Sequence, residues 1–193
     1  MKTFILGITG ASGSLYAVHT ARALMEAGCR LHIVSTDMGR RVMEYETGRS
    51  IQEWTAGLPD SVSLEDNNDL FASIASGSHP CDGMAVVPCS MSTLGQLASG
   101  ITPNLLTRAA DVTLKQKRPL VLVPRETPLT CIHLKNMLAL AQCGAAIVPA
   151  MPAYYNHPRT LDDIASFMAG RILDCFGIEN HIYTRWREER NEL

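Results

Sequence analysis

The sequence predicts an α/β fold built around one parallel sheet, and three observations support this prediction. Short continuous apolar runs recur along the 193 residues, at positions 4–8, 30–35, 83–88, 119–124 and 145–149. The runs do not alternate with polar residues, which is typical of parallel strands covered on both faces. Stretches with helical spacing separate them, and a repeated strand–helix order produces a parallel sheet.

Four of the intervening stretches have the spacing of amphipathic helices. Residues 15–27 place Leu15, Val18 and Leu24 on one face, and Gly28 then ends the helix. The others are residues 104–115, 130–143 and 161–176, the last opening on a threonine cap and two aspartates. These elements predict a doubly wound, Rossmann-like or flavodoxin-like sheet with helices on both faces.

Two regions carry no such pattern. Residues 49–80 are polar and rich in Gly, Ser, Asp and Asn, so we expect an irregular excursion there. The charged tail from about residue 185 (RWREERNEL) is expected to form a solvated helix or an arm on a neighbouring subunit. No repeat or linker divides the chain, so residues 1–193 are predicted to form a single domain.

Composition and charge argue against several classes of protein. A formal net charge of -2 gives no reason to expect binding to nucleic acid or to a membrane surface. The apolar runs are too short to span a bilayer, and the N-terminus enters a strand without a signal pattern. The six cysteines form no CxxC motif or Cys/His cluster, which indicates reduced, mostly buried thiols and no metal site. We therefore expect a cytoplasmic protein.

The segments that follow the strands indicate where a ligand binds. In an open parallel sheet, ligands bind outside the carboxyl ends of the strands. Hydroxyls, small residues, one arginine and one glutamate gather in the segments that follow the five runs, at 9–14, 35–37, 89–93, 125–128 and 151–155. This composition suits a phosphate group joined to a polar ring system.

The first of these segments lies in the stretch GITGASGSLYA, which has the form of a phosphate-binding turn. A nucleoside triphosphate loop requires a lysine after the last glycine, and none follows Gly13. A dinucleotide site requires glycines separated by one residue, whereas two residues separate Gly7 from Gly10. Ser35 also occupies the place of the ribose-binding acid, although Asp37 is nearby, so a dinucleotide is disfavoured.

A single phosphate monoester fits the turn better. Backbone amides at a helix N-terminus, with the hydroxyls of Ser12 and Ser14, are suited to one phosphate group. The alternative is that the small residues only allow a tight connection between strand and helix.

The turn is accompanied by further motifs along the chain. In order, these are TGASG at 9–13 with Tyr16, PCSMSTL at 88–94, RAADV at 108–112 with Lys115, RPLVLVPRETP at 118–128, PAYYNHP at 152–158 and RIL at 171–173. This series closely resembles the UbiX/Pad1 family of flavin prenyltransferases, from about residue 3 to residue 186.

The resemblance implies a reaction and an assembly. Members of this family transfer a dimethylallyl group from dimethylallyl monophosphate, or from the diphosphate in some members, to N5 of reduced FMN. A second bond to C6 then closes a fourth ring, and the product is the cofactor of UbiD-type decarboxylases. The family needs no metal. Its subunits form homododecamers built from trimers, with the flavin between subunits.

The resemblance also assigns site residues by motif. The positions that bind FMN in the family correspond to Gly10, Ala11, Ser12, Ser35, Ser90, Met91, Ser92, Thr93 and Arg125. Those that bind the dimethylallyl phosphate are Tyr155 and Arg171, with Lys115 and Arg108 near the same end. The catalytic candidates are Glu126, Glu46, Ser12 and Lys115, of which Glu46 rests on an alignment shifted by one residue.

These residue types suit the chemistry. A departing phosphate needs fixed positive charge and hydrogen-bond donors, which arginine, lysine and tyrosine supply. An allylic cation needs aromatic walls without water, and Tyr154, Tyr155 and Trp186 could provide them. The nucleophile is the flavin, so the protein needs none of its own. Either Glu126 or the released phosphate could accept the C6 proton.

Several residues have a structural alternative. Arg125 could form an ion pair with Glu126 or Asp111 instead of binding a ligand. Arg171 falls in an apolar helix face, where an unpaired charge would be costly, and this favours a buried anionic ligand. Cys89 lacks an apparent histidine or aspartate partner, so we expect a small core residue.

Other functions remain as alternatives. An FMN-dependent cysteine decarboxylase would carry an active histidine near the first helix and a PASANT-like segment. Here PCSMST lacks the asparagine, and His19 is a poor substitute for that histidine. A non-catalytic flavin-binding subunit of an aromatic-acid decarboxylase would need no second anion site, and nothing specific indicates a decarboxylase acting alone. The sequence leaves open the choice of donor and the decarboxylase that receives the product.

Overall fold

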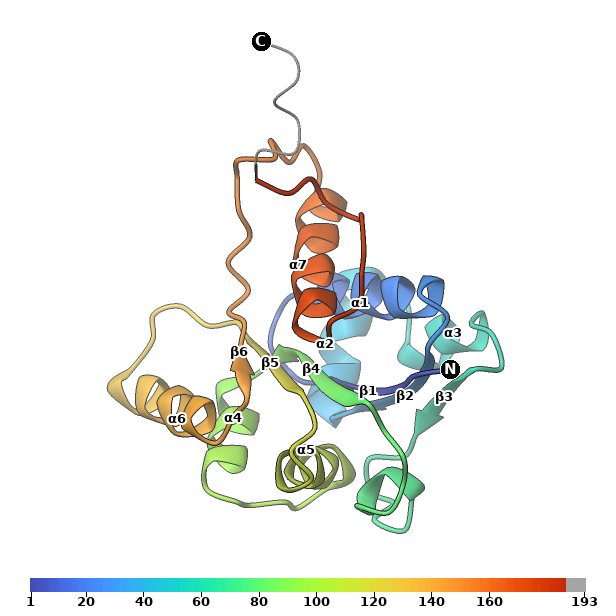
Figure 1. Ribbon diagram of the computed structural model, residues 1–193, viewed down its shortest axis with the longest axis vertical. Helices are drawn as coiled ribbons and strands as arrows, with labels where there is room; N and C mark the ends of the chain where they lie inside the picture. The colour runs from blue at the N-terminus through green and yellow to red at the C-terminus, as the bar shows by residue number, and fades with distance from the viewer. Residues whose placement is uncertain (187–193) are drawn as a thin grey trace.

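A six-stranded parallel sheet forms the centre of the computed structural model, which describes residues 1–186 (Figure 1). The strands are β1 (Thr3–Ile8), β2 (Arg30–Ser35), β3 (Val62–Glu65), β4 (Gly83–Cys89), β5 (Leu120–Pro124) and β6 (Ala146–Ile147). Their order is β3-β2-β1-β4-β5-β6. The order reverses between β1 and β4, which makes this the switch point of a doubly wound sheet. The predicted fold class is confirmed.

Seven α-helices connect the strands in the described part of the chain. They are α1 (Ser14–Glu26), α2 (Asp37–Thr47), α3 (Ile51–Ala56), α4 (Met91–Ala98), α5 (Leu105–Lys115), α6 (Cys131–Gln142) and α7 (Leu161–Cys175). Six of them begin at a side chain that accepts a hydrogen bond from a backbone amide three residues on, namely Thr36, Ser50, Ser90, Asn104, Thr130 and Thr160. Such caps satisfy amides that the first helical turn leaves open.

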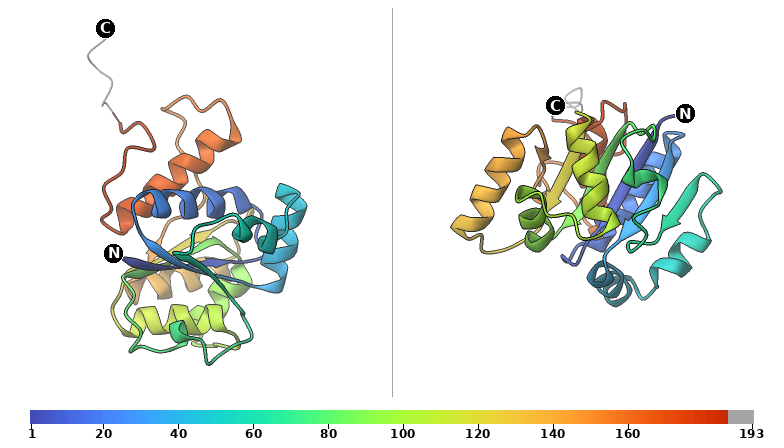
Figure 2. Two further views of the ribbon diagram at one scale, coloured as in Figure 1. Left: turned by 90° about the vertical axis from the view of Figure 1, so that its right-hand side faces the viewer. Right: turned by 90° about the horizontal axis from the view of Figure 1, so that it is seen from below.

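The helices cover both faces of the sheet (Figure 2). Phe4, Leu6 and Ile8 of β1 belong to the buried cluster that includes α1 and α7. Ile5 points to the other side, into the cluster formed with α4, α5 and α6. This alternation along one strand follows from the two-residue period of β structure. Helices α1 and α7 therefore lie on the opposite face from α5.

Where the sequence and the structure differ, the elements are short or exposed. Residues 49–80 contain α3, β3 and a 3₁₀ turn, so the expectation of an irregular excursion is wrong. Strand β3 pairs on one side only and is nowhere fully buried, which explains its lack of a continuous apolar run. Helix α2 was not predicted because it buries only Gly39 and Met43. Helix α4 is only eight residues long.

The cysteines are free thiols in the structure. Cys29 and Cys89 are buried, but Cys131, Cys143 and Cys175 are exposed, so the expectation of mostly buried thiols is wrong. The three exposed cysteines lie at the ends of α6 and α7, where side chains turn towards solvent.

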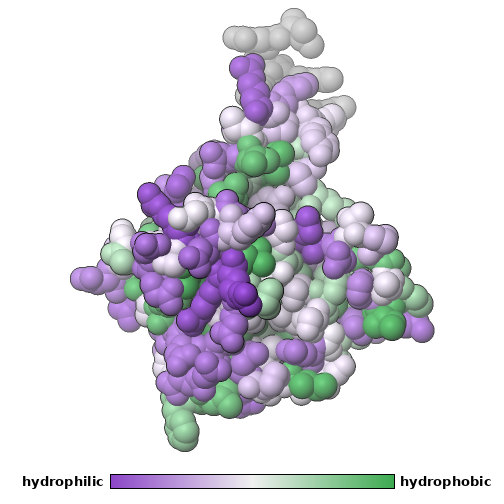
Figure 3. Space-filling view, turned by 180° about the vertical axis from the view of Figure 1, so that it is seen from behind, coloured by the Kyte–Doolittle hydropathy of each residue, from purple (hydrophilic) through white to green (hydrophobic). Residues whose placement is uncertain are grey.

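On the face shown in Figure 3, polar side chains cover much of the area and apolar ones form small separate patches. None of the helices within residues 1–186 is long and apolar enough to cross a membrane. Most of the charged tail lies outside the described residues. Of its members, Trp186 stacks edge-on against Tyr155, with 5.0 Å between ring centroids.

Candidate functional site

The turns that follow β1 and β4 meet at the carboxyl edge of the sheet, beside the switch point (Figure 1). Thr9 joins them, because its hydroxyl donates to the carbonyl oxygen of Pro88 at 2.8 Å and accepts from the amide of Ser90 at 2.7 Å. Thr9 is buried. Apart from the position of Thr9 after a strand, no sequence pattern indicated this role.

The β1–α1 turn requires glycine at its centre. A Cβ atom on Gly10 would lie 2.7 Å from the Cβ of Met38, so the turn passes too close to the start of α2 for any side chain. Gly13 has a φ of 117°, a left-handed conformation that favours glycine. Because these two residues have no side chain, a ligand beside the turn can approach its backbone closely.

Glu46 closes the other side of this turn. Its carboxylate accepts hydrogen bonds from the amide of Ser14 at 2.8 Å and from that of Gly13 at 3.1 Å. Partial burial raises the pKa of Glu46, but these bonds and one from the Ser12 side chain outweigh it, so the pKa is lowered. The carboxylate is therefore ionised at neutral pH and occupies the positive end of α1. A phosphate on these two amides, as the sequence suggested, would compete with Glu46.

A second helix start at the same edge is better placed to receive an anion. The N-cap Ser90 of α4 accepts from the amide of Thr93 at 3.3 Å and donates to the Thr93 hydroxyl at 3.1 Å. The amides of Met91 and Ser92 belong to the first turn and have no intrahelical acceptor. Ser35, at the end of β2, is fully buried and donates to the carbonyl oxygen of Ile8 at 3.2 Å.

Arg125 and Glu126 follow β5 at this edge, and both are exposed. The charge of Arg125 lowers the pKa of the Tyr16 phenol, although burial is the larger effect and raises it overall. Asp111 pairs instead with Arg108 at 3.2 Å, so Arg125 does not take it as a structural partner. A carboxylate oxygen of Glu126 accepts from the amide of Thr127 at 3.0 Å.

Cys89, the last residue of β4, is a core residue as predicted. It is completely buried, and this burial raises the pKa of its thiol to about 12. A thiol with such a pKa is not a nucleophile at neutral pH.

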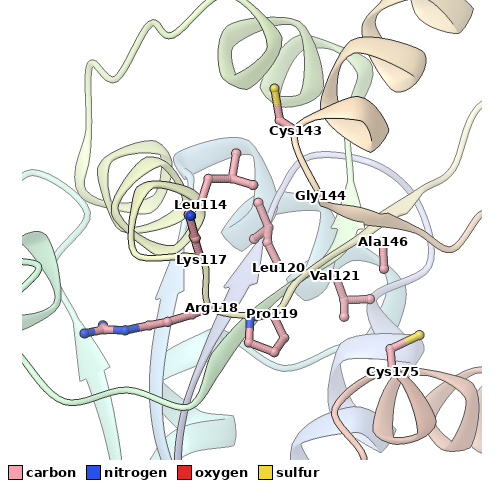
Figure 4. A pocket seen from close by; sticks show the side chains of 10 residues that line it. All are labelled: Leu114, Lys117, Arg118, Pro119, Leu120, Val121, Cys143, Gly144, Ala146 and Cys175. Carbon is pink, nitrogen blue, oxygen red and sulfur yellow. The ribbon is translucent and has the colours of Figure 1, made fainter.

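A cavity of about 310 Å³ opens beside the β1–α1 turn. Ser12, Gly13, Tyr16 and Glu46 form its polar end, while the apolar wall consists of Leu15, Leu161, Ile164 and Ala165. A larger cavity, about 510 Å³, lies at the opposite edge, where Pro119, Leu120 and Val121 enter β5 (Figure 4). Because parallel sheets bind ligands at the carboxyl edge, we assign the candidate site to the smaller cavity.

Aromatic side chains gather where α7 meets the C-terminal segment. Tyr155 packs edge-on against Trp186, with ring centroids 5.0 Å apart, and against Phe167 at 6.2 Å. Phe167 in turn contacts Tyr183 at 5.0 Å. The structure thus brings together Tyr155 and Trp186, two of the three aromatic residues that the sequence suggested as walls, while Tyr154 is mostly exposed.

The expectation that Arg171 lies buried in an apolar helix face is wrong. Its side chain is 49% exposed rather than buried in an apolar face, and its guanidinium donates to Asp174 at 2.9 Å. The apolar face of α7 is made by its neighbours Ala169, Gly170, Ile172 and Leu173. Arg171 therefore has a protein partner, and burial alone does not call for a ligand.

The expectation that Lys115 and Arg108 lie near Tyr155 and Arg171 is wrong within one chain. Both are on α5, on the opposite face of the sheet from α7 (Figure 2). Lys115 ends α5 just before β5 begins, which places it at the amino edge. Arg108 donates to Asp111 and to the carbonyl oxygen of Ala75.

His19 holds the start of α7 against α1. The imidazole is 8% exposed, with Nε2 2.8 Å from a carboxylate oxygen of Asp162 and Nδ1 3.1 Å from the hydroxyl of Ser166. Both partners lie on α7, whose first turns form the apolar wall of the candidate cavity. His19 is thus a packing residue directed at α7.

Replacing His19 by alanine is expected to destabilise the fold by about 1–3 kcal/mol, because it removes two hydrogen bonds and leaves a buried space. Urea unfolding at neutral pH measures this. The control is His181→Ala, since that imidazole is 84% exposed and should leave the midpoint unchanged. Equal midpoints for His19→Ala and the wild type would contradict the packing role.

Comparison with known proteins now gives the family. The model of the Flavoprotein family matches residues 1–173. The flavin prenyltransferase UbiX of Alkalihalophilus pseudofirmus is 46% identical over 194 residues, which cover 97% of each chain. This chain belongs to the UbiX family of flavin prenyltransferases. The prediction made from the motifs is confirmed.

Solved structures of the UbiX family agree. AnUbiX in complex with FMN and dimethylallyl pyrophosphate has a TM-score of 0.92 at 38% identity, covering 96% of this chain and 97% of that chain. A dodecameric FMN-dependent UbiX-like decarboxylase from Escherichia coli O157:H7 has a TM-score of 0.91 at 46% identity, covering 96% and 99%. The cysteine decarboxylase TvaF, in contrast, is 22% identical with a TM-score of 0.58, which concerns the fold alone.

Proposed function

We propose that this chain transfers a dimethylallyl group from dimethylallyl phosphate to N5 and C6 of reduced FMN, without a metal ion. The observation that carries the proposal is the meeting of four turns at one sheet edge, after β1, β2, β4 and β5. The residues assigned to FMN lie in these turns, at the end of β2 or in the first turn of α4. The AnUbiX complex with FMN and dimethylallyl pyrophosphate supports the same pairing of ligands.

The flavin site that we propose consists of Gly10, Ala11, Ser12, Ser35, Ser90, Met91, Ser92, Thr93 and Arg125. The residues fit an FMN molecule, because the first-turn amides of α4 can donate hydrogen bonds to its phosphate and the bare backbone at Gly10 permits close approach. Arg125 adds a fixed positive charge. The carboxylate of Asp111 does not pair with it, because Asp111 pairs with Arg108. When bound, reduced FMN supplies the nucleophilic nitrogen.

The donor site that we propose has two parts. Tyr155 and Arg171 bind the phosphate of the dimethylallyl donor from the side of α7. Lys115 and Arg108 are too far away within one chain, so we propose that a neighbouring copy supplies them. The dodecameric assembly of the Escherichia coli O157:H7 relative supports a site shared between copies, and a homododecamer is proposed here.

The catalytic roles that we propose concern charge and protons. Lys115 stabilises the departing phosphate by charge, while Arg171 binds the donor before the transfer. Ser12 and the ionised Glu46 lie together at the polar end of the cavity, where they orient the reacting groups and exclude water. Glu126 or the released phosphate accepts the proton lost from C6.

Mass analysis of the flavin tests this function. Anaerobic incubation with reduced FMN and dimethylallyl monophosphate should convert the flavin to a species heavier by one dimethylallyl unit. A parallel reaction with the diphosphate identifies the preferred donor, and oxidised FMN serves as the negative control. Unmodified flavin with both donors would contradict the proposal.

We also propose which protein uses the product and where in the cell the reaction takes place. A UbiD-type decarboxylase would consume the product, because a prenylated flavin has no further role in this site. We place the enzyme in the cytoplasm, since three exposed free thiols are compatible with a reducing compartment. Residues 1–193 would act as a single FMN-binding domain. Some solved structures of relatives are described as decarboxylases, but no residue of the candidate site in this chain indicates decarboxylation.

A further inference from the structure

One carboxylate connects the last turn of α7 with the segment that follows it. Asp174 accepts a hydrogen bond from Arg171 at 2.9 Å, from the Tyr183 hydroxyl at 2.7 Å and from Arg185 at 2.9 Å. The side-chain amide of Asn180 donates to it as well, at 3.0 Å. Two cations and two neutral donors thus converge on a single acidic group.

Tyr183 is fixed at the centre of this cluster. Its hydroxyl donates to Asp174 and accepts from Arg171 at 3.3 Å and from Arg185 at 3.2 Å. Its ring lies so close to the backbone of Gly170 that a Cβ atom there would be 2.3 Å from the ring. The ring also contacts Phe167, the neighbour of Tyr155. The cluster and the aromatic side chains near Tyr155 are therefore one packed unit.

The position of Arg171 in the cluster leaves part of its guanidinium available. Among residues 1–186, the hydrogen bonds of its guanidinium run from Nη1 to Asp174 and Tyr183, and 49% of the side chain is exposed. A planar guanidinium held on one side can present its remaining N–H groups in a fixed direction. Arg171 shares the Asp174 carboxylate with Arg185, so this carboxylate does not belong to Arg171 alone.

We propose that Asp174 is a positioning residue for Arg171, fixing its guanidinium so that the free edge binds the phosphate of the allylic donor. The inference deepens the proposed function and rests on its assignment of Arg171 to the donor. Tyr183 takes part because its hydroxyl accepts from the same Nη1 atom of Arg171. Asp174 itself does not touch the donor.

Two opposing effects make the outcome of a substitution informative. Removing the negative charge of Asp174 strengthens the electrostatic attraction between the cluster and a phosphate. Removing the acceptor also frees the Arg171 side chain, which must then be ordered when the donor binds. If orientation dominates, donor affinity falls. If Asp174 only competes with the phosphate for Arg171, donor affinity rises.

The experiment titrates dimethylallyl monophosphate into the FMN-loaded, oxidised protein by calorimetry, where no transfer takes place. Asp174→Asn is expected to weaken donor binding about three- to tenfold while FMN occupancy stays unchanged. Tyr183→Phe keeps the ring packing and should weaken binding less. Glu179→Gln is the control, because its 90% exposed carboxylate contacts only His181 among the described residues.

Single-turnover prenyl transfer provides a second readout. In Asp174→Asn, the donor concentration for half-maximal rate should rise by the same factor, while the maximal rate changes little. Tighter or unchanged donor binding in Asp174→Asn would overturn the inference, as would absence of donor binding to the wild type. A wild type that binds the donor but leaves the flavin unmodified would contradict the proposed function alone.

Discussion

Replacing Arg125 by alanine is expected to yield a protein that purifies with little FMN. Arg125 is exposed at the carboxyl edge, near Tyr16, and the one acidic residue of α5 that it could have paired with is bound to Arg108. A fixed cation beside a phosphorylated ligand is hard to replace. Its loss should cost roughly 2–5 kcal/mol, or on the order of thirtyfold or more in affinity.

The measurement is the flavin-to-protein ratio of the purified variant, followed by FMN titration of the stripped protein. Arg22→Ala removes an exposed arginine of α1 and should retain flavin at the wild-type level. Arg125→Lys keeps the charge but not the planar donor group, and should bind with intermediate affinity. Stoichiometric FMN in Arg125→Ala would assign Arg125 a structural role instead.

Elements of the fold that are buried on both faces could be predicted from sequence. The runs at 4–8, 30–35, 83–88 and 119–124 correspond to β1, β2, β4 and β5, because central parallel strands must be apolar throughout. The edge strand β3 escaped prediction because only one side of it pairs. Helix α2 also escaped prediction, because it is mostly exposed and has few apolar residues to show a helical period.

The flavin side of the candidate site was predictable because it follows from topology. Each of its turns comes directly after a strand, so the carboxyl edge brings together segments as distant as Gly10 and Arg125. Glu46 is different, since it reaches the β1–α1 turn from the last turn of α2. Only the family resemblance pointed to it, and no local pattern did.

The donor side could not be predicted in the same way. Helical spacing placed Arg171 on an apolar face, but its long side chain leaves that face and reaches Asp174. The partners Asn180, Tyr183 and Arg185 come from an irregular segment that folds back on α7, and no period in the sequence reveals such contacts. Likewise, the distance of Lys115 from Arg171 depends on which face of the sheet α5 covers.

The central claim is that separate residues of this chain bind the flavin and the donor phosphate. Tyr155 lies before α7 and Arg171 lies on it. The flavin residues, in contrast, lie in the turns and element ends at the carboxyl edge of the sheet. Tyr155→Phe and Arg171→Ala should therefore leave FMN binding nearly intact. Each removes a hydrogen bond to a charged phosphate, which corresponds to roughly 1.5–3 kcal/mol, or on the order of ten- to a hundredfold in donor affinity.

The most direct test measures flavin occupancy together with single-turnover prenylation at several donor concentrations, in the wild type and in Arg171→Ala. The wild-type ratio of FMN to protein should persist in the variant. Its prenylation rate should fall at low donor concentration and recover as the donor is raised. If Arg171→Ala instead loses flavin and turnover together, Arg171 supports the fold or the FMN site, and the assignment of separate sites is wrong.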